Sequence, residues 1–315
     1  MNSDATTDAA AVKRYLDAEQ RLLDRYGVDA ERRMVDVTAI GGHASVLVCG
    51  SGPPVMMVVG GGPPTGIWVP LMAELTGFRL HAVDLPGLGL TSPTSFTTAN
   101  LRRMAVAFLD EVTTKLGIGT SVFMAQSMGS LWTFWLALDR PHRVRAVSSL
   151  SCPATMLRTS APVPLRLASV RTIGRLLQRV DPPSPRQVDR FIRMAGETFH
   201  DQAELRALFL ALEQLPGYSD ALLDAVHSMV RLRGARPEVA ITESSVAAIE
   251  QPVQLIWGQH DPFGSPEVGR QAARLLPHGE LHVVPGGHGF WVDDPKRVAG
   301  LVGPFLERYS ETVGA

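Results

Sequence analysis

Cysteine is scarce in this chain, with only Cys49 and Cys152 among 315 residues. Two thiols outside any metal-ligand spacing predict neither a disulfide scaffold nor a metal site, so we expect both to be core thiols. No apolar stretch is long enough to cross a bilayer, and no basic start followed by an apolar run marks the N-terminus. We therefore expect a cytoplasmic protein with no membrane partner.

Charge of either sign is nearly balanced, and the formal net charge is −1. A chain without a basic excess has no overall electrostatic attraction to nucleic acid or to acidic membranes, so we expect no nucleic-acid partner. Arginines concentrate modestly between Arg158 and Arg193. We interpret this cluster as solvated helix faces and not as a phosphate-binding site.

Hydrophobic residues make up 45% of the chain, which is enough for a substantial core. Short apolar runs typical of strands buried on both faces alternate with helical patterns, which predicts an α/β fold with a mostly parallel sheet. We expect strands at residues 33–39, 44–49, 55–59, 78–83, 122–124, 144–150, 253–257 and 281–284, and helices at residues 99–116, 266–276 and 295–309.

The N-terminal segment precedes this alternation. Residues 9–26 follow an amphipathic helical pattern that ends at Gly27. The first two predicted strands then flank the segment Ile40–His43, which is a hairpin signal. We treat residues 1–30 as a helical extension that either packs against the sheet or mediates contact between copies of the chain.

Strand-like sequence disappears between Ser151 and about Val246. Prolines cluster there between helical patterns at residues 165–180, 185–195, 202–215 and 219–232. Sheet-type sequence returns afterwards, so we expect a helical cap inserted into one α/β domain and not a separate tail domain. The predicted division is a core of residues 31–151 and 247–315 and a cap of residues 152–246.

Ser127 stands between a buried strand and an apolar helix. A serine at the apex of such a turn exposes its hydroxyl, and the strained backbone needs small neighbours, here Ala125 and Gly129. The turn also places the N–H of Met128 at a helix N-terminus, where it can donate to a developing oxyanion. Taken alone, the pattern is also typical of a serine that caps a core helix.

A glycine-rich loop, Gly60 to Gly66, follows the strand at residues 55–59. Glycines let the backbone approach a ligand closely, and we predict that the N–H of Gly62 joins that of Met128 in an oxyanion hole. The alternative is a flexible turn. A phosphate-binding loop is disfavoured because no Lys-Ser or Lys-Thr pair follows the glycines.

Two later loops carry groups that could activate Ser127. Asp261 follows the strand at residues 253–257, and His288 follows the strand at residues 281–284. Loops beyond the carboxyl ends of parallel strands meet at one edge of the sheet, so we expect the three side chains to converge. His288 would take the serine proton and return it later, while Asp261 would orient the imidazole. Taken singly, Asp261 is also typical of a turn cap, and His288 of an exposed loop histidine.

Other titratable residues compete for these roles. Asp84 is the rival acid, but its place before Pro86 and a glycine favours a turn anchor. Asp293 and Asp294 are better placed to start the last helix. His260 neighbours Asp261 in sequence, so its side chain should point away from the site.

The chain resembles the α/β-hydrolase superfamily from about residue 33 to residue 306. The resemblance rests on five segments: Gly60-Gly-Gly-Pro63, Asp84-Leu-Pro-Gly-Leu-Gly89, Ala125-Gln-Ser-Met-Gly129, Trp257-Gly-Gln-His-Asp-Pro262 and Gly286-Gly-His288. It implies an eight-stranded, mostly parallel sheet with a helical cap between the sixth and seventh strands. It also implies hydrolysis of an ester, amide or related bond through an acyl-serine.

The chain departs from the family pattern in two places. The family often has His-Gly where this chain has Gly60-Gly61, and the segment around Ser127 begins with Ala125 where glycine is commoner. The oxyanion donor is a backbone group, so neither change removes a catalytic group. The same segments are also similar to carbon–carbon bond hydrolases of aromatic meta-cleavage pathways, and the glycine loop more loosely to proline iminopeptidases. A serine nucleophile disfavours the dehalogenase and epoxide-hydrolase branches, which use aspartate.

We expect Trp68, Gln126, Phe263 and Phe290 to line a largely apolar substrate pocket. The apolar cap residues that roof this pocket or pack the cap helices are Met156, Leu157, Met194, Phe199, Leu208, Phe209, Tyr218 and Met229. No acidic cluster is evident to bind a free amino terminus, which disfavours a peptidase.

The sequence therefore predicts a cofactor-free serine hydrolase acting on a small, largely apolar ester, thioester or lactone. One alternative is a carbon–carbon bond hydrolase or an acyltransferase that uses the same three residues. Another is a non-catalytic ligand-binding protein on the same scaffold. The expected partner is a small-molecule substrate, and the oligomeric state stays open, a homo-oligomer included.

Overall fold

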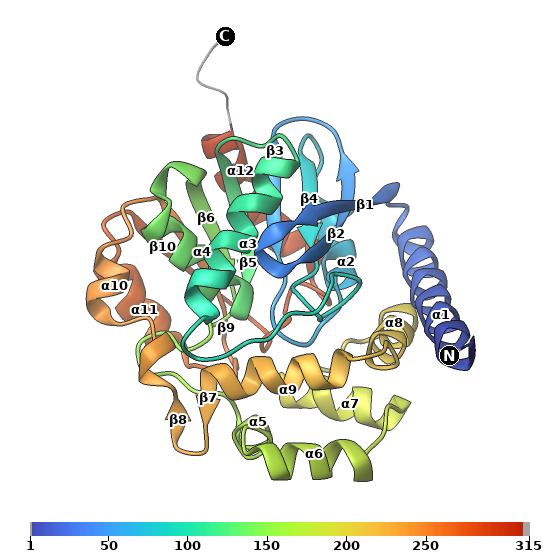
Figure 1. The fold of residues 1–315 in the computed structure, drawn as a ribbon. Coiled ribbons are helices and arrows are strands. Elements are labelled where there is room, and N and C mark those ends of the chain that lie inside the picture. Colours follow the sequence, from blue (N-terminus) through green and yellow to red (C-terminus); the bar gives the residue numbers. More distant parts are fainter. Residues whose placement is uncertain (1, 311–315) are drawn as a thin grey trace.

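The computed structural model describes residues 2–310 and is built around an eight-stranded sheet (Figure 1). Its strands are β1 (Ala30–Val37), β2 (Gly42–Gly50), β3 (Pro54–Val58), β4 (Arg79–Val83), β5 (Ser121–Gln126), β6 (Val144–Leu150), β9 (Val253–Gly258) and β10 (Gly279–Val284). They lie in the order β1-β2-β4-β3-β5-β6-β9-β10. β2 is antiparallel to β1 and β4, and every other neighbouring pair is parallel. The predicted mostly parallel sheet is confirmed.

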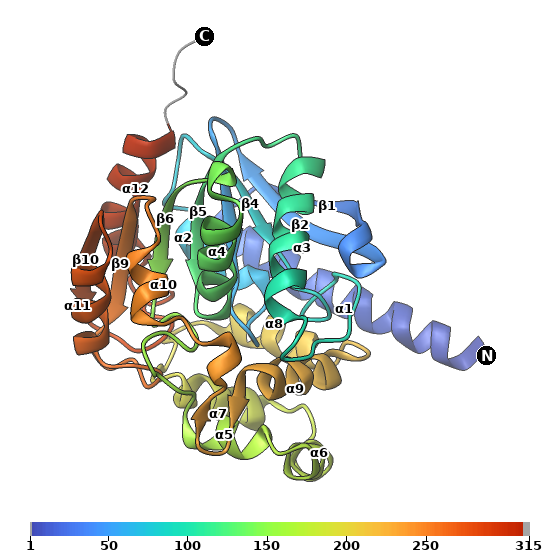
Figure 2. The same ribbon diagram turned by 60° about the vertical axis from the view of Figure 1, so that its left-hand side comes forward.

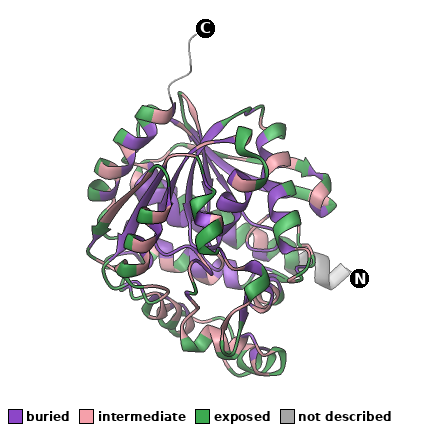
Figure 3. Ribbon diagram, turned by 90° about the vertical axis from the view of Figure 1, so that its left-hand side faces the viewer, coloured by how far each residue is buried: buried purple, intermediate pink, exposed green. Residues whose placement is uncertain are grey.

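Helices cover both faces of this sheet (Figures 1 and 2). Those of the core are α2 (Val69–Met72), α3 (Leu101–Lys115), α4 (Met128–Asp139), α10 (Glu243–Ala247), α11 (Pro266–Leu275) and α12 (Pro295–Ser310). α3 packs against α4, and α12 packs against α2 and against the central strands. The six inner strands are almost wholly buried between these layers, whereas most residues of the edge strands β1 and β10 are exposed or half-buried (Figure 3).

Five further helices lie beyond the carboxyl ends of the parallel strands, between β6 and β9 in the chain (Figure 1). These cap helices are α5 (Val163–Ala168), α6 (Arg171–Val180), α7 (Pro185–Met194), α8 (Ala203–Glu213) and α9 (Tyr218–Met229). The helix predicted over residues 165–180 is divided in two at Ser169 and Val170. The helix predicted over residues 219–232 ends at Met229, where the small hairpin β7 (Val230–Arg231) and β8 (Gly234–Ala235) begins.

The N-terminal helix α1 (Asn2–Tyr26) packs against the cap helix α8 and against α2. It is also tied to the sheet, because buried Glu19 accepts from the guanidinium of Arg32 on β1 at 2.7 Å. Arg32 in turn donates to Asp84 at 2.7 Å and to Thr65 at 2.9 Å. The extension therefore contacts both the core and the cap.

No helix in the described part of the chain is long and apolar enough to cross a membrane.

Candidate active site

Ser127 occupies a strained turn between β5 and α4. Its φ of 54° and ψ of −113° lie where L-residues rarely stay, and such strain persists only where the surroundings enforce it. A Cβ on Gly129 would come within 2.2 Å of the carbonyl oxygen of Val58, so this position requires glycine. The helix that follows begins at Met128, whose N–H has no partner one turn earlier within the helix.

Asp261 and His288 form a buried hydrogen-bonded pair. The imidazole Nδ1 lies 2.8 Å from Oδ2 and 2.9 Å from Oδ1 of the carboxylate. The carboxylate also accepts from the N–H of Cys152 at 2.8 Å and from the N–H of Phe263 at 2.9 Å. With its oxygens held from several directions, Asp261 fixes the orientation of the ring and favours the tautomer with hydrogen on Nδ1.

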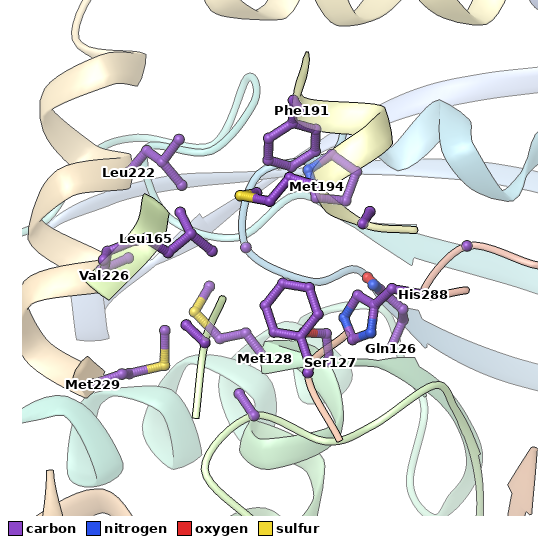
Figure 4. Close-up of a pocket in the computed structure, with 18 of the residues that line it drawn as sticks. Gln126, Ser127, Met128, Leu165, Phe191, Met194, Leu222, Val226, Met229 and His288 are labelled. Atoms are coloured by element: carbon purple, nitrogen blue, oxygen red, sulfur yellow. The ribbon is translucent and has the colours of Figure 1, made fainter. Parts of the chain in front are cut away.

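The other imidazole nitrogen is available on the side of Ser127. His288 Nε2 is buried and has no hydrogen-bond partner among the described residues. Ser127 and His288 both line one cavity, and Figure 4 shows their side chains next to each other at its floor. The ring of Phe263 stacks on the imidazole with centroids 4.0 Å apart, which further restrains it. The loops after β5, β9 and β10 thus bring the predicted nucleophile, acid and base together.

The glycine loop lies against the turn that carries Ser127. The N–H of Gly60 donates to Oε1 of Gln126 at 2.8 Å, and a Cβ at Gly60 would lie 2.2 Å from that oxygen. The carboxamide of Gln126 therefore occupies the space that a side chain at position 60 would fill, and its hydrogen bond to Gly60 supports the loop. Gly62, with φ of 117°, is held from the cap by the hydroxyl of Tyr218, which donates to its carbonyl.

The cavity above Ser127 is apolar and is walled mostly by the cap (Figure 4). Gly61, Pro63 and Met128 line it beside the serine, and Leu165, Phe191, Met194, Leu222, Val226 and Met229 line it from α5, α7 and α9. No Asp, Glu, Lys or Arg is among its lining residues in the described chain.

Two of the four predicted pocket residues line this cavity, and two do not. Gln126 and Phe263 are lining residues. Trp68 is fully buried, and its ring stacks on Trp291 with centroids 5.0 Å apart. Phe290 also faces inward and packs edge-on against Trp291 at 5.4 Å. Both aromatic side chains belong to the hydrophobic core and do not line the cavity, so the prediction that they line the substrate pocket is wrong.

The apolar cap residues divide in the same way. Met194, Phe199, Phe209 and Met229 line the cavity. The others pack the cap or join it to the core, and they are Met156, Leu157, Leu208 and Tyr218.

The other titratable residues considered for the catalytic roles either have different partners or are exposed. Asp84 accepts from Arg32 and from the N–H of Leu90 at 3.1 Å, as a turn anchor would. His260 is exposed. Asp294 immediately precedes α12 and accepts from the N–H of Arg297 at 3.3 Å, which is a helix-start role.

Glu197 is a site residue that the sequence did not reveal. It follows α7 in the cap, it is buried, and its Oε1 accepts from the N–H groups of Gly287 and Gly289 at 2.8 Å each. These two glycines flank His288, so the cap holds the histidine loop directly. Burial raises the pKa of Glu197. The sequence signal was slight, an acidic residue among apolar cap residues, and nothing in it indicated the partner.

No group of three or more His, Cys, Asp or Glu side chains that could hold a metal ion occurs in the part of the chain that the structure describes.

Comparison with known proteins gives a consistent result. A family model described as "alpha/beta hydrolase fold" matches residues 53–295. A pimeloyl-[acyl-carrier protein] methyl ester esterase of Yersinia enterocolitica is 29% identical over 83% of this chain and 96% of its own length. A 2-hydroxy-6-oxononadienedioate/2-hydroxy-6-oxononatrienedioate hydrolase of Burkholderia vietnamiensis is 26% identical over 86% of this chain and 89% of its own. The solved structure of carboxylesterase CesB from Bacillus subtilis superposes with a TM-score of 0.75 at 20% identity, covering 94% of this chain and 98% of that one.

Proposed function

Since this chain belongs to the alpha/beta hydrolase family, we propose that it is a serine hydrolase that cleaves a small, largely apolar ester, thioester or lactone without a cofactor. The observation that carries the proposal is the Asp261–His288 pair, whose free Nε2 lies beside Ser127 on the floor of an apolar cavity. We place this activity in the cytoplasm, with a small molecule as the partner.

In this mechanism the Ser127 hydroxyl attacks the carbonyl carbon while His288 Nε2 takes its proton. Asp261 stabilises the imidazolium that forms. The N–H groups of Gly62 and Met128 bind the oxyanion of the tetrahedral intermediate, and one such donor typically contributes about 3 kcal/mol to lowering the barrier. His288 then protonates the leaving alcohol or thiol. Water, activated by the same imidazole, finally releases the acid from the acyl-serine.

The lining of the cavity supports a neutral, apolar substrate. A charged group in such a cavity would lose its hydration without gaining an ion partner, because no lining residue carries a permanent charge. The apolar wall formed by Leu165, Leu222, Val226 and Met229 lies away from Ser127 (Figure 4), where an aliphatic chain would extend. A free amino terminus would find no carboxylate there, which disfavours a peptidase.

A second candidate function is carbon–carbon bond hydrolysis, which the relative from Burkholderia vietnamiensis supports. That relative is named as a hydrolase of a dienedioate. A dienedioate carries two carboxylates, and the cavity offers no Arg or Lys to bind them. We therefore favour ester hydrolysis. An acyltransferase or a non-catalytic ligand-binding protein would use the same cavity, and turnover measurements separate both from a hydrolase.

The test is a panel of p-nitrophenyl esters that differ in acyl length, assayed with the wild type, Ser127→Ala and Ser160→Ala. Ser160 lines the same cavity and is the matched control. Loss of the nucleophile should lower kcat by about 10⁴-fold or more, whereas Ser160→Ala should stay within about 3-fold of the wild type. Undiminished turnover by Ser127→Ala would rule the proposal out. Turnover of a dienone but of no ester would favour the carbon–carbon bond hydrolase.

A further inference from the structure

The cap helix α6 turns its apolar side outward. Leu176, Leu177 and Val180 are 57%, 42% and 67% exposed. At 100° per residue these side chains form one stripe along the helix. Buried Gly174 and half-buried Gln178 lie on a different side, toward α9. An amphipathic helix normally buries its apolar stripe, so this exposed stripe needs a separate explanation.

Two neighbouring elements have the same character. On α5, Val163 and Leu167 are 55% and 40% exposed, and α5 packs against both α6 and β7. Leu232, at the tip of the β7–β8 hairpin, is 52% exposed and is flanked in sequence by Arg231 and Arg233. Figures 1 and 2 both show α5, α6 and this hairpin at one end of the molecule, on the side of the cap away from the sheet. We call these three elements the outer cap face.

The outer cap face is cationic although the whole chain is nearly neutral. Residues 163–180, which contain α5 and α6, include four arginines and no acidic residue, and Asp181 at the end of α6 is paired with Arg190 of α7. Arg171 is paired with Asp224 of α9 at 3.3 Å, and Asp220 of α9 lines the same pocket as Arg175. Arg175 and Arg179 form no ion pair within the described residues. On α6 these two arginines fall beside the apolar stripe, as the 100° spacing requires.

We propose that the outer cap face binds the surface of an anionic phospholipid bilayer, with α6 lying in the plane of the headgroups. This proposal revises two expectations from the sequence, that the chain has no membrane partner and that the arginines of this region only solvate helix faces. A strongly amphipathic, arginine-flanked aliphatic stripe is the pattern of helices that lie in such an interface. Aliphatic side chains from α5, α6 and the hairpin can enter one planar surface together, while the arginines meet lipid phosphates.

Other occupants fit these observations less well. A second copy of the chain would bring two arginine-rich faces against each other, which is unfavourable in a symmetric contact. Stable protein interfaces are enriched in aromatic anchors, and residues 158–184 and 230–236 contain no Phe, Tyr or Trp. The lipid surface is the partner that needs only aliphatic contact and positive charge.

If the chain has the proposed function, docking of the outer cap face also affects access to the substrate cavity. Leu165 lines the cavity above Ser127, and its neighbours Val163 and Leu167 on α5 are exposed on the outer cap face. Docking would therefore place a wall of the substrate cavity at the bilayer, where apolar esters concentrate. The binding itself does not depend on catalysis.

The experiment is co-sedimentation of the full chain with phosphatidylcholine vesicles that contain or lack phosphatidylglycerol. Leu176→Ser combined with Leu177→Ser and Val180→Ser should weaken partitioning to anionic vesicles about 100-fold, because three aliphatic side chains no longer insert. Arg175→Gln combined with Arg179→Gln should weaken partitioning to anionic vesicles about 30-fold, because each arginine near the surface contributes about 1 kcal/mol to binding.

Matched controls change similar residues elsewhere. Met34→Ser removes a side chain that is 51% exposed on β1, and Arg14→Gln with Arg21→Gln removes two exposed charges on α1. Both controls should bind vesicles as the wild type does, and all variants should hydrolyse a water-soluble ester at the wild-type rate. Ser127→Ala should also bind normally, so that a failure of the proposed activity and a failure of vesicle binding can be told apart.

Four outcomes would overturn the proposal. The wild type could fail to sediment with anionic vesicles at low salt. The triple Leu/Val→Ser variant and the double Arg→Gln variant could bind vesicles as strongly as the wild type. A dimer in light scattering that the triple substitution dissociates would assign the face to a second copy. Binding to soluble polyglutamate but not to vesicles would assign it to an acidic protein.

Discussion

Replacing Glu197 with alanine should lower kcat while leaving KM nearly unchanged. The carboxylate accepts from the N–H groups of Gly287 and Gly289 at 2.8 Å each, and these residues flank His288. The N–H of His288 itself donates to the carbonyl of Ala195 at 2.8 Å. The backbone on both sides of the proposed base is therefore anchored to one short segment of the cap.

The magnitude follows from these contacts. A hydrogen bond to a charged group contributes about 1.5–3 kcal/mol, so losing two removes about 3–6 kcal/mol. Burial raises the pKa of Glu197, because taking an ionised carboxylate out of water is unfavourable, and this cost offsets part of that contribution. We expect a net loss of about 2–4 kcal/mol in the free energy of unfolding. A released loop that lets the imidazole shift by about 1 Å should lower kcat about 100-fold.

The assay is steady-state hydrolysis of a water-soluble ester, together with urea unfolding. Glu197→Gln keeps Oε1 as the acceptor of both bonds and should stay within about 5-fold of the wild-type kcat, because neutral acceptors are about half as strong. Glu204→Gln is the control, since Glu204 is a cap carboxylate that pairs with Arg25 away from the cavity. Wild-type kcat in Glu197→Ala, or a rise in KM alone, would refute the reasoning.

Three further predictions concern buried or largely buried polar side chains. Gln126→Ala removes the acceptor of the Gly60 N–H and should lower kcat/KM for soluble esters about 10-fold, and an unchanged kcat/KM would show that the glycine loop holds its position without this bond. Burial raises the pKa of Glu213 from 4.5 to about 7, so the folded state binds this proton more tightly than the unfolded state, and stability falls as pH rises through that interval. Glu213→Gln should therefore be more stable than the wild type at pH 8, by up to about 3 kcal/mol in urea unfolding, and equal to it below about pH 4; a pH-independent difference would contradict this. Arg32→Met leaves the buried carboxylates of Glu19 and Asp84 unpaired and should cost about 3–5 kcal/mol of unfolding free energy, whereas an unchanged urea midpoint would show that the pairing is dispensable.

The sheet was predictable because strands buried on both faces appear as continuous apolar runs, such as Val55–Val59. The rule that ligands bind beyond the carboxyl ends of parallel strands then placed Ser127, Asp261 and His288 together without coordinates. Boundaries inside the cap were harder to predict. The break at Ser169 and Val170, between α5 and α6, has neither proline nor glycine to mark it.

Side-chain roles that depend on partners far away in the sequence could not be predicted from the sequence alone. Trp68 is adjacent to the glycine loop and was expected in the pocket, but it is held in the core by Trp291, which comes from the opposite end of the chain. Glu197 acts on glycines of a loop far along the sequence, and no local pattern records that contact. The outward apolar stripe of α6 has the same periodicity as a buried one, so only the burial of each residue reveals it.

The proposal that Ser127 is the nucleophile is tested most directly by mass spectrometry after incubation with a fluorophosphonate ester. We expect the intact protein to gain one adduct, peptide mapping to locate it on Ser127, and Ser127→Ala to remain unmodified. An ester-cleaving wild type that stays unmodified, or that carries its adduct on another residue, would contradict this account.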